Sequence, residues 1–429
     1  MKIVYSTGKK AITKVQAVVI AIIILITIVA GVAYYYTTLT PTQQLQFKNG
    51  KRVMYLTPRI EETFWVACME YLKRAVEADG WTFAFDSAGG SVSTQYDQVI
   101  NYAPLYDLII LFPIDKDGVK EAVRIAQEQY HTPVIYVKNF AIGDGRFNIG
   151  FDDVRAGEMM AELAIEYLVN KYGNAEGRTI VYFTHTTGGW LLRKTGIEKV
   201  KAKHPEVNWV ELPTGGTVAG WADAADAYFS VNTADVILSS SDGPYFKGVL
   251  DALERYGKLY YAEDPNHIYC ITIDGKPSQY QWIRRGYADV ALPQPIDAIM
   301  YATWELAKEY IVKDPSYQYP PYKMPEIPVP LVVKQPEGAF WGGENVTITL
   351  ERGKVFPETN MPQAMTPVYT VNRHNVNDWR FWGNTYTFWK GKEPIQDVTW
   401  KAKGTKPAWS DQLLNEYETK FWAEFAGRH

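Results

Sequence analysis

The chain has 429 residues, which is enough for two or three domains. Its apolar fraction of 47%, charged fraction of 21% and net charge of −4 are typical of a globular protein, and they argue against nucleic acid or an anionic membrane surface as a partner. Two cysteines exclude a disulfide framework, and the six histidines lack metal-ligand spacing. The sequence therefore indicates neither a metal nor another cofactor.

Residues 17–36 are an apolar run of 20 residues without a charge, long enough to cross a bilayer as a helix. Four lysines and no acidic residue precede this run: Lys2, Lys9, Lys10 and Lys14. The positive-inside rule then places the N-terminus in the cytoplasm and everything after Tyr36 outside the cell. We expect residues 1–36 to be a basic N-terminus with a single transmembrane anchor, followed by a polar linker at 37–49.

The stretch "KKAITKVQ" resembles an archaeal class III, type IV pilin-like signal, which would be cut between Ala11 and Ile12. Pilins usually carry Glu at the fifth mature position, where this chain has Gln16. This departure favours a simple anchor over the core of a filament.

From Arg52 onward, short apolar strands alternate with amphipathic helices. The expected strands are "RVMYLT", "WTFAF", "DLIILF", "PVIYV" and "FNIGF", and then "TIVYF", "NWVEL", "ADVILS" and "IYCITI". Unbroken apolar strands between helices indicate parallel sheets that are covered on both faces. The sequence therefore predicts an α/β fold with two doubly wound parallel-sheet lobes around a central cleft, where ligands bind beyond the carboxyl ends of the strands.

The residues at these strand ends form a candidate ligand site. They are Glu62, Phe64, Trp65, Asp115, Lys138 and Asn139 in the first set, and Trp190, Arg193, Ser241, Asp242, Asp274 and Gln294 in the second. Aromatic rings stack on sugar C–H faces, and carboxylates, amides and an arginine hydrogen-bond to hydroxyl groups. Asp115 and Asp242 are equally consistent with helix caps, and Arg193 with a solvated charge.

Asp274 ends an apolar strand in "IYCITIDGKPSQYQWIRRG". Ser278 is closer to the helix that follows and is expected to cap it. Asp274 is then free to accept hydrogen bonds from a ligand.

Several motifs follow one another in the order of a known family. They are "ETFWVAC", "FPIDKDGVKEAV", "FDDVRAGEMMAELAIEYL", "LLRKTGIEKVKAKHP", "SSSDGPYFKGVLDALERYG", "ITIDGKPS" and "VPLVVKQP". On these motifs the chain from about Arg52 to Pro336 resembles the ribose-type (type I) periplasmic sugar-binding proteins of ABC transporters. The resemblance implies a cleft with three hinge crossings. It also implies an N-terminal lobe of residues 50–139 with 295–326, and a C-terminal lobe of 140–294 with 327–336.

The resemblance assigns ligand contacts to Phe64, Trp65, Arg193 and Asp274. Elsewhere the chain departs from the family: Glu62 and Ser241 each replace an Asn, and Lys138 and Asn139 replace an Asp-Arg pair. These departures argue against ribose. They favour another sugar or polyol, or an acidic sugar paired with Lys138.

Residues 337–429 extend beyond the family and hold seven of the 14 tryptophans. We expect this aromatic-rich extension to pack on the lobes, the alternative being a surface for a partner. It contains the strand-like runs "NVTITL" and "NTYTFWK", and a closing helix with Ser410 as its cap. Asn345 begins an N-glycosylation acceptor, "NVT".

The function that these features favour is a membrane-anchored extracellular solute-binding protein, which captures a sugar or polyol and delivers it to the permease of an ABC importer. A pilus-like or adhesin subunit is the alternative, suggested by the leader and the aromatic extension. A glycosidase pair among Glu62, Asp115 and Asp274 is disfavoured, because these carboxylates lie on different lobes and no nucleophile motif appears. The membrane segment and the lack of a DNA-binding helix pair argue against a transcription regulator.

Overall fold

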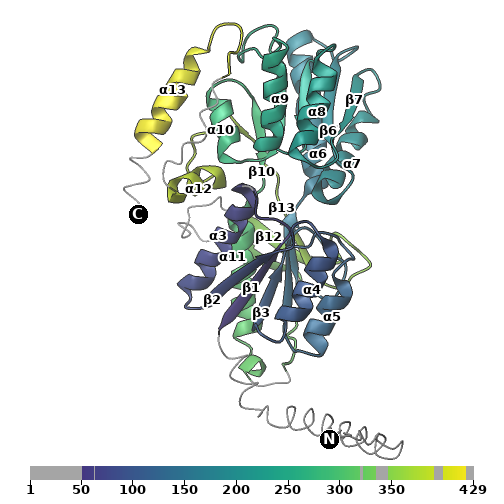
Figure 1. The fold of residues 1–429 in the computed structure, drawn as a ribbon, viewed down its shortest axis with the longest axis vertical. Helices are drawn as coiled ribbons and strands as arrows, with labels where there is room; N and C mark the ends of the chain where they lie inside the picture. Colours follow the sequence, from purple (N-terminus) through teal and green to yellow (C-terminus); the bar gives the residue numbers. More distant parts are fainter. Residues whose placement is uncertain (1–50, 62, 319–321, 335–345, 391–399, 422–429) are drawn as a thin grey trace, which may run out of the picture.

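In a computed structural model of the protein, two α/β lobes lie one above the other (Figure 1). The structure describes residues 51–61, 63–318, 322–334, 346–390 and 400–421. The expected membrane anchor and linker, together with Glu62 and Asn345, lie outside these residues. Within the part of the chain that the structure describes, no helix has both the length and the apolar character needed to cross a membrane.

The first lobe is built around one mixed sheet. Its strands are β1 (Arg52–Thr57), β2 (Thr82–Ser87), β3 (Leu108–Leu111), β4 (Val134–Lys138), β5 (Asn148–Phe151), β11 (Leu331–Lys334), β12 (Thr347–Arg352) and β13 (Pro362–Thr366). Its helices are α3 (Thr63–Ala78), α4 (Val92–Tyr102), α5 (Lys120–Glu128) and α11 (Ile296–Ala307), followed by η1 (Lys308–Val312) and η2 (Pro315–Gln318). The strand order is β11-β12-β13-β5-β4-β3-β1-β2, and only β12 runs antiparallel to its neighbours.

The second lobe repeats the scheme with a smaller sheet. Its strands are β6 (Thr179–Thr184), β7 (Asn208–Pro213), β8 (Val236–Ser239), β9 (Tyr269–Asp274), β10 (Val290–Pro293) and β14 (Val371–Asn372). Its helices are α6 (Asp153–Tyr172), α7 (Gly188–Lys201), α8 (Val218–Phe229), α9 (Pro244–Arg255) and α10 (Pro277–Arg284). The order is β14-β10-β9-β8-β6-β7, with β14 antiparallel to β10. The two lobes, each with a mainly parallel sheet, confirm the predicted two-lobe α/β fold.

Helices cover both faces of each sheet because the central strands are apolar throughout. Helices α3 and α11 pack on one face of the first sheet, and α4 and α5 pack on the other. In the second lobe, α6 and α7 cover one face, and α8, α9 and α10 cover the opposite face. Strands β3 and β8 are buried over their whole length, as expected for strands between two helix layers.

The lobe boundaries expected at residues 140 and 327 need correction. Strand β5 pairs in parallel with β4, so residues up to 151 belong to the first lobe. Strand β11 pairs with β12, which reaches β5 through β13, so residues 331–334 also belong to the first lobe. The chain therefore crosses back to the second lobe between β13 and β14, and not near residue 327.

The extension packs on both lobes, as expected. Strands β12 and β13 complete the first sheet, and β14 adds to the second. Helix α12 (Trp382–Lys390) lies between the lobes beside α3 and α10, while α13 (Ala408–Glu416) and η3 (Tyr417–Phe421) lie on the second lobe (Figure 1).

Two local predictions for the extension are wrong. "NTYTFWK" is helical, because Trp382 and Tyr386 are four residues apart and bury the same face of α12. Ser410 lies buried inside α13, whose N-cap is Pro407, so it does not cap that helix.

Candidate functional site

A cavity of about 270 Å³ lies between the lobes, where the carboxyl ends of the two sets of strands meet. We call it the cleft cavity. Its lining includes Arg59, Phe64, Trp65, Phe112, Lys138 and Asn139 from the first lobe, and His185, Trp190, Arg193, Ser241, Asp274 and Gln294 from the second. Nine of the residues predicted from sequence are therefore brought together in one place: Phe64, Trp65, Lys138, Asn139, Trp190, Arg193, Ser241, Asp274 and Gln294.

Among the described residues, two predicted site residues, Asp115 and Asp242, are not part of this lining. Glu62 lies outside the described residues. Asp115 is at the surface, where its carboxylate accepts hydrogen bonds from the backbone N–H groups of Asp117 at 2.9 Å and Gly118 at 2.8 Å. Asp115 therefore stabilises the turn before α5, which corrects its assignment to the ligand site.

Aromatic side chains form walls of the cleft cavity on both lobes. In the first lobe, Trp65 contacts the rings of Phe64 and Phe112, with centroids 5.5 and 4.8 Å apart. In the second lobe, the Trp190 ring contacts the His185 ring edge-on, with the ring centroids 5.4 Å apart. Trp65 and Trp190 are only half-buried, so ring surface remains for a ligand.

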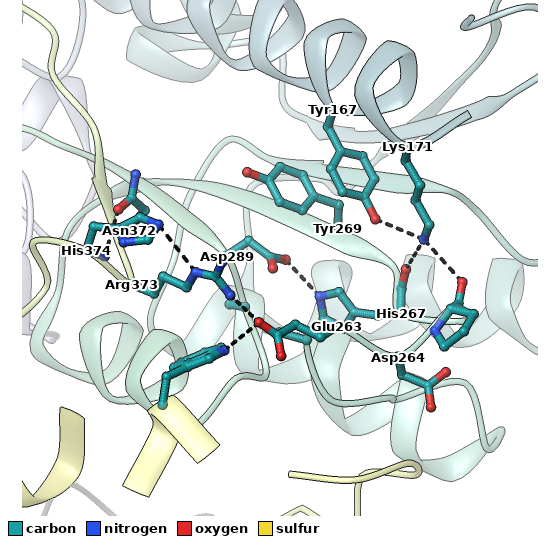
Figure 2. A pocket seen from close by; sticks show the side chains of 14 residues that line it. Tyr167, Lys171, Glu263, Asp264, His267, Tyr269, Asp289, Asn372, Arg373 and His374 are labelled. Atoms are coloured by element: carbon teal, nitrogen blue, oxygen red, sulfur yellow. Dashed lines mark hydrogen bonds and ion pairs between the residues drawn. The ribbon is translucent and has the colours of Figure 1, made fainter. Parts of the chain in front are cut away.

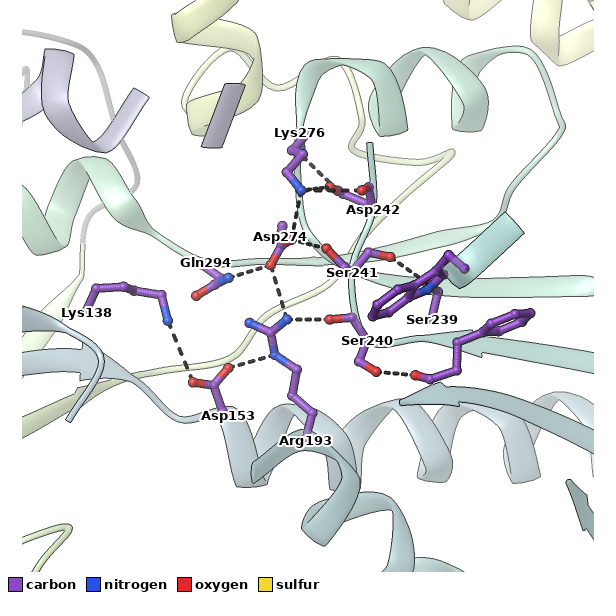
Figure 3. Close-up of polar contacts among 12 residues, drawn as sticks. Lys138, Asp153, Arg193, Ser239, Ser240, Ser241, Asp242, Asp274, Lys276 and Gln294 are labelled. Atoms are coloured by element: carbon purple, nitrogen blue, oxygen red, sulfur yellow. Dashed lines mark hydrogen bonds and ion pairs between the residues drawn. The ribbon is translucent and has the colours of Figure 1, made fainter. Parts of the chain in front are cut away.

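Arg193 lies on α7, which packs closely against α6. A Cβ atom on Gly157 would lie 1.9 Å from the backbone oxygen of Arg193, so only glycine fits there. Arg193 is buried, with 4% of the residue exposed. Its Nε donates to Asp153 Oδ1 at 2.7 Å, its Nη1 lies 3.3 Å from Asp274 Oδ1, and Nη1 also donates to the Ser240 carbonyl (Figure 3).

Asp274 is surrounded by donors, so the expectation that its carboxylate is spare is wrong. Its Oδ2 accepts from Ser241 Oγ at 2.9 Å and from Lys276 Nζ at 3.1 Å, and its Oδ1 accepts from Gln294 Nε2 (Figure 3). Burial opposes the charged form, but Lys276 and Arg193 more than offset this and hold the pKa of Asp274 below its usual value. The carboxylate therefore stays ionised in a preorganised ring of donors.

The expected cap at Ser278 is also wrong. Helix α10 begins at Pro277, its N-cap is Lys276, and no side chain caps it. The chain turns sharply here, with φ of +105° at Asp274 and +74° at Gly275. A non-glycine residue in this region of φ is strained, which indicates that the surroundings hold the turn in place.

Lys138 and Asp153 link the two lobes. The Lys138 Nζ, at the end of β4, lies 3.7 Å from Asp153 Oδ2, in the first turn of α6, and both side chains are buried. Burial lowers the pKa of Lys138, with Asp153 acting in the opposite direction. The sequence reasoning missed Asp153, because an acidic residue at a helix start is explained by capping alone; the cap here is its neighbour Asp152.

Asp242 lies behind the cavity, which corrects its predicted contact with the ligand. Its Oδ1 is 3.2 Å from Lys276 Nζ, and its Oδ2 accepts from the Lys276 backbone N–H at 2.9 Å. Burial raises the pKa of Asp242 to about 7 against the opposing effect of Lys276. Asp242 and Lys276, the latter missed from sequence, together support the turn that carries Asp274.

A second cavity, of about 430 Å³, lies at the opposite end of the second-lobe sheet (Figure 2). Tyr167 and Tyr269 form one wall, with stacked rings 4.0 Å apart. On the extension side, Arg373 pairs with Glu263, which also accepts from Trp409 Nε1 at 3.0 Å. These contacts join the extension to the second lobe far from the cleft cavity.

In the lining of this second cavity, His267 is largely buried and its Nε2 lies 2.9 Å from Asp289 Oδ2. Burial disfavours the His267 cation, but Asp289 more than offsets this, and the pKa of His267 is raised above its usual 6.5. A raised folded-state pKa stabilises the fold fully below that usual value, and the contribution is lost as pH rises through the raised pKa.

We therefore expect His267→Gln to destabilise the protein more at about pH 5.5 than at about pH 8.5, as measured by denaturant unfolding. His204, a partly exposed histidine 2.9 Å from Glu206, provides the matched control through His204→Gln. An equal loss of stability at both pH values would contradict the predicted charge on His267.

The sequence of residues 53–315 matches the family model of the periplasmic binding protein domain. The chain belongs to this family. Family members are binding proteins of sugar transport, so the chain is a binding protein and not an enzyme. No curated protein sequence matches the chain. Among the described residues, no group of His, Cys, Asp or Glu side chains is arranged to hold a metal ion.

Solved structures of periplasmic binding proteins share this fold. A protein from Mycobacterium smegmatis in complex with β-D-fucofuranose has a TM-score of 0.58 at 17% identity, over 76% of this chain and 93% of that chain. The Caulobacter myo-inositol binding protein has a TM-score of 0.57 at 15% identity, and the match covers 77% of this chain and 95% of that chain. A periplasmic solute-binding protein from Actinobacillus succinogenes with bound D-allose has a TM-score of 0.58 at 14% identity, and the match covers 76% of this chain and 99% of that chain.

Proposed function

We propose that the protein is an extracellular solute-binding protein, anchored in the cell membrane through residues 17–36, that captures a neutral sugar or polyol and presents it to the permease of an ABC importer. The observation that carries this proposal is the cleft cavity between two lobes, with aromatic walls and a ring of buried carboxylate, amide and guanidinium groups. The basic residues before the apolar run support the orientation, which protease treatment of intact cells would test.

Ligand capture by such a site is a closure of two lobes around the ligand. Trp65 and Asn139 come from the first lobe, and Trp190 and Asp274 come from the second. A sugar that contacts both sets gains more contacts when the lobes are together, so its binding shifts the population toward the closed form. The permease would then recognise the closed form.

The charges around the cavity favour a neutral ligand over an acidic sugar. The buried cations Lys138 and Arg193 already face the carboxylates of Asp153 and Asp274. An anionic sugar would have to compete with these carboxylates in a buried setting, where repulsion between like charges is strong. A polyol instead adds hydrogen bonds without adding charge.

The direct test is calorimetry on the full-length chain, purified in detergent, with D-fucose, D-allose, L-arabinose, myo-inositol and D-galacturonate. We expect one of the neutral compounds to bind with measurable heat and to be recovered chemically unchanged. Preferential binding of D-galacturonate would contradict the neutral-ligand proposal, and binding of none would contradict the function. Filaments in surface fractions together with absent binding would favour the structural-subunit alternative.

Replacing Asp274 with asparagine is expected to weaken sugar binding by roughly 10- to 150-fold, because a hydrogen bond to a charged group contributes about 1.5–3 kcal/mol. The matched control is Asp115→Asn, which removes a carboxylate that lies outside the cleft cavity. Calorimetry on both variants makes the comparison. An affinity unchanged in Asp274→Asn would show that the ligand site is elsewhere.

A further inference from the structure

Helix α12 of the extension is fastened to the second lobe by buried polar contacts. The Arg284 guanidinium, on α10, donates to Asn384 Oδ1 at 2.8 Å, to the Val376 carbonyl at 2.9 Å and to Asn377 Oδ1 at 2.7 Å. The backbone of Gly383 lies so near α10 that an added Cβ would be 2.5 Å from the Gly275 carbonyl oxygen. The start of α12 is thus seated directly on the turn that follows Asp274.

The same helix also contacts the first lobe. The Tyr71 hydroxyl, on α3, donates to the Trp382 carbonyl at 3.1 Å and lies 2.6 Å from Thr385 Oγ1. The Trp382 ring meets Phe64 nearly edge-on, with centroids 6.1 Å apart. Phe64 lines the cleft cavity, so Trp382 lies directly behind its first-lobe wall.

Trp382 contacts the second-lobe side of the cavity through its indole. Its Nε1 donates to the backbone oxygen of Asp274 at 2.9 Å, and its side chain is 0% exposed. Asp274 has the φ of +105° described above. A strained residue persists only where its surroundings determine its conformation, and this buried hydrogen bond is one of the contacts that do so.

We propose that Trp382 is a positioning residue of the cleft cavity: it holds the Asp274 backbone in the conformation that aims the carboxylate into the cavity, and it couples that turn to Phe64 of the first lobe. The proposal rests on the proposed function. It implies that the site is completed by a segment beyond residue 315, where the match to the family domain ends.

The test compares two tryptophans of the extension. Trp382→Phe keeps an aromatic ring but removes the donor to Asp274. Trp400→Phe removes an equivalent buried donor, since Trp400 Nε1 donates to Asp251 Oδ1 at 2.8 Å, far from the cleft cavity. For the neutral sugar of the panel that binds wild type most tightly, we expect Trp382→Phe to weaken affinity about tenfold, chiefly through faster dissociation, and Trp400→Phe to leave it unchanged.

Gly383→Ala is a second, independent variant, because its new methyl group collides with the Gly275 carbonyl and displaces the start of α12. We expect it to weaken the same sugar at least as much as Trp382→Phe. Unchanged affinity in both Trp382→Phe and Gly383→Ala overturns the positioning role while leaving the proposed function intact. An equal loss of affinity in Trp400→Phe also overturns it, since general destabilisation would then explain the effect.

Hydrogen exchange on the ligand-free protein separates this proposal from the proposed function. The Lys276 backbone N–H, which donates to Asp242, reports on the order of the Asp274 turn. We expect this amide to exchange faster in Trp382→Phe than in wild type or Trp400→Phe. If the Lys276 amide exchanges at the same rate in Trp382→Phe as in wild type, the positioning role is overturned, even where no sugar of the panel binds. If this amide exchanges faster but no sugar binds, only the proposed function is contradicted.

Discussion

Replacing Arg193 with leucine is expected to lower the free energy of unfolding by about 3–5 kcal/mol, the usual loss when one partner of a buried ion pair is removed. The reason is that Arg193 is 4% exposed and faces two buried carboxylates, those of Asp153 and Asp274. Without the guanidinium, these carboxylates remain in a poorly solvated setting with fewer cations, and the Ser240 carbonyl loses its donor. Denaturant unfolding at neutral pH measures the difference.

Arg155 is the matched control. It also pairs with two carboxylates, Glu158 at 3.3 Å and Glu162 at 2.8 Å, but its side chain is 44% exposed. Solvent-exposed ion pairs contribute little, so Arg155→Leu should cost less than about 1 kcal/mol. A loss in Arg193→Leu no larger than that of Arg155→Leu would show that Asp153 and Asp274 find other partners or take up protons.

Ending the chain after Pro336 is expected to abolish cooperative folding of the first lobe. Strand β13 lies between β5 and β12, and Ile348, Leu350 and Ala364 are fully buried in the first-lobe core. Each large apolar side chain contributes about 1.5–3 kcal/mol on burial, and a domain has only about 5–15 kcal/mol of net stability. Circular dichroism and thermal unfolding of the shortened chain should show lost structure and not merely a lower midpoint.

A chain that ends after Thr366 is the control for this truncation. It keeps β12 and β13 but removes α12 and α13. We expect it to retain a folded first lobe with lower overall stability. If both truncated chains unfold as cooperatively as the full chain, β12 and β13 are dispensable additions to the sheet.

The alternation of apolar strands and amphipathic helices was sufficient to predict the two lobes, because hydrophobic periodicity records which faces are buried. The pairing of strands distant in sequence was not predictable in this way. Strand β13 joins β5 across more than 200 residues of chain. A short strand such as Pro362–Thr366, with little apolar character of its own, acquires its place only from the neighbours it meets.

Strand ends were a good guide to the cleft cavity because parallel strands present their carboxyl ends at one edge of the sheet. They did not distinguish residues that line the cavity from those that support it. Asp274 ends β9 and Asp242 follows β8, yet only Asp274 lines the cavity, while Asp242 lies behind it. No sequence pattern marked Trp382 as part of the site, because its contact with the Asp274 backbone depends on the tertiary packing of α12.

The position of β13 also has a consequence for biosynthesis. The parallel strands of the second lobe are contiguous in sequence, from β6 to β10, and the extension later adds β14, α13 and η3 to this lobe. The first lobe begins earlier in the chain, but its sheet stays incomplete beside β5 until β13 has been synthesised. Nascent chains fold as their domains become available, so here the sheet of the first lobe, although started first, is still incomplete when all the parallel strands of the second lobe have been synthesised. Until then, the open edge of β5 is a pairing site that a chaperone or another chain can reach.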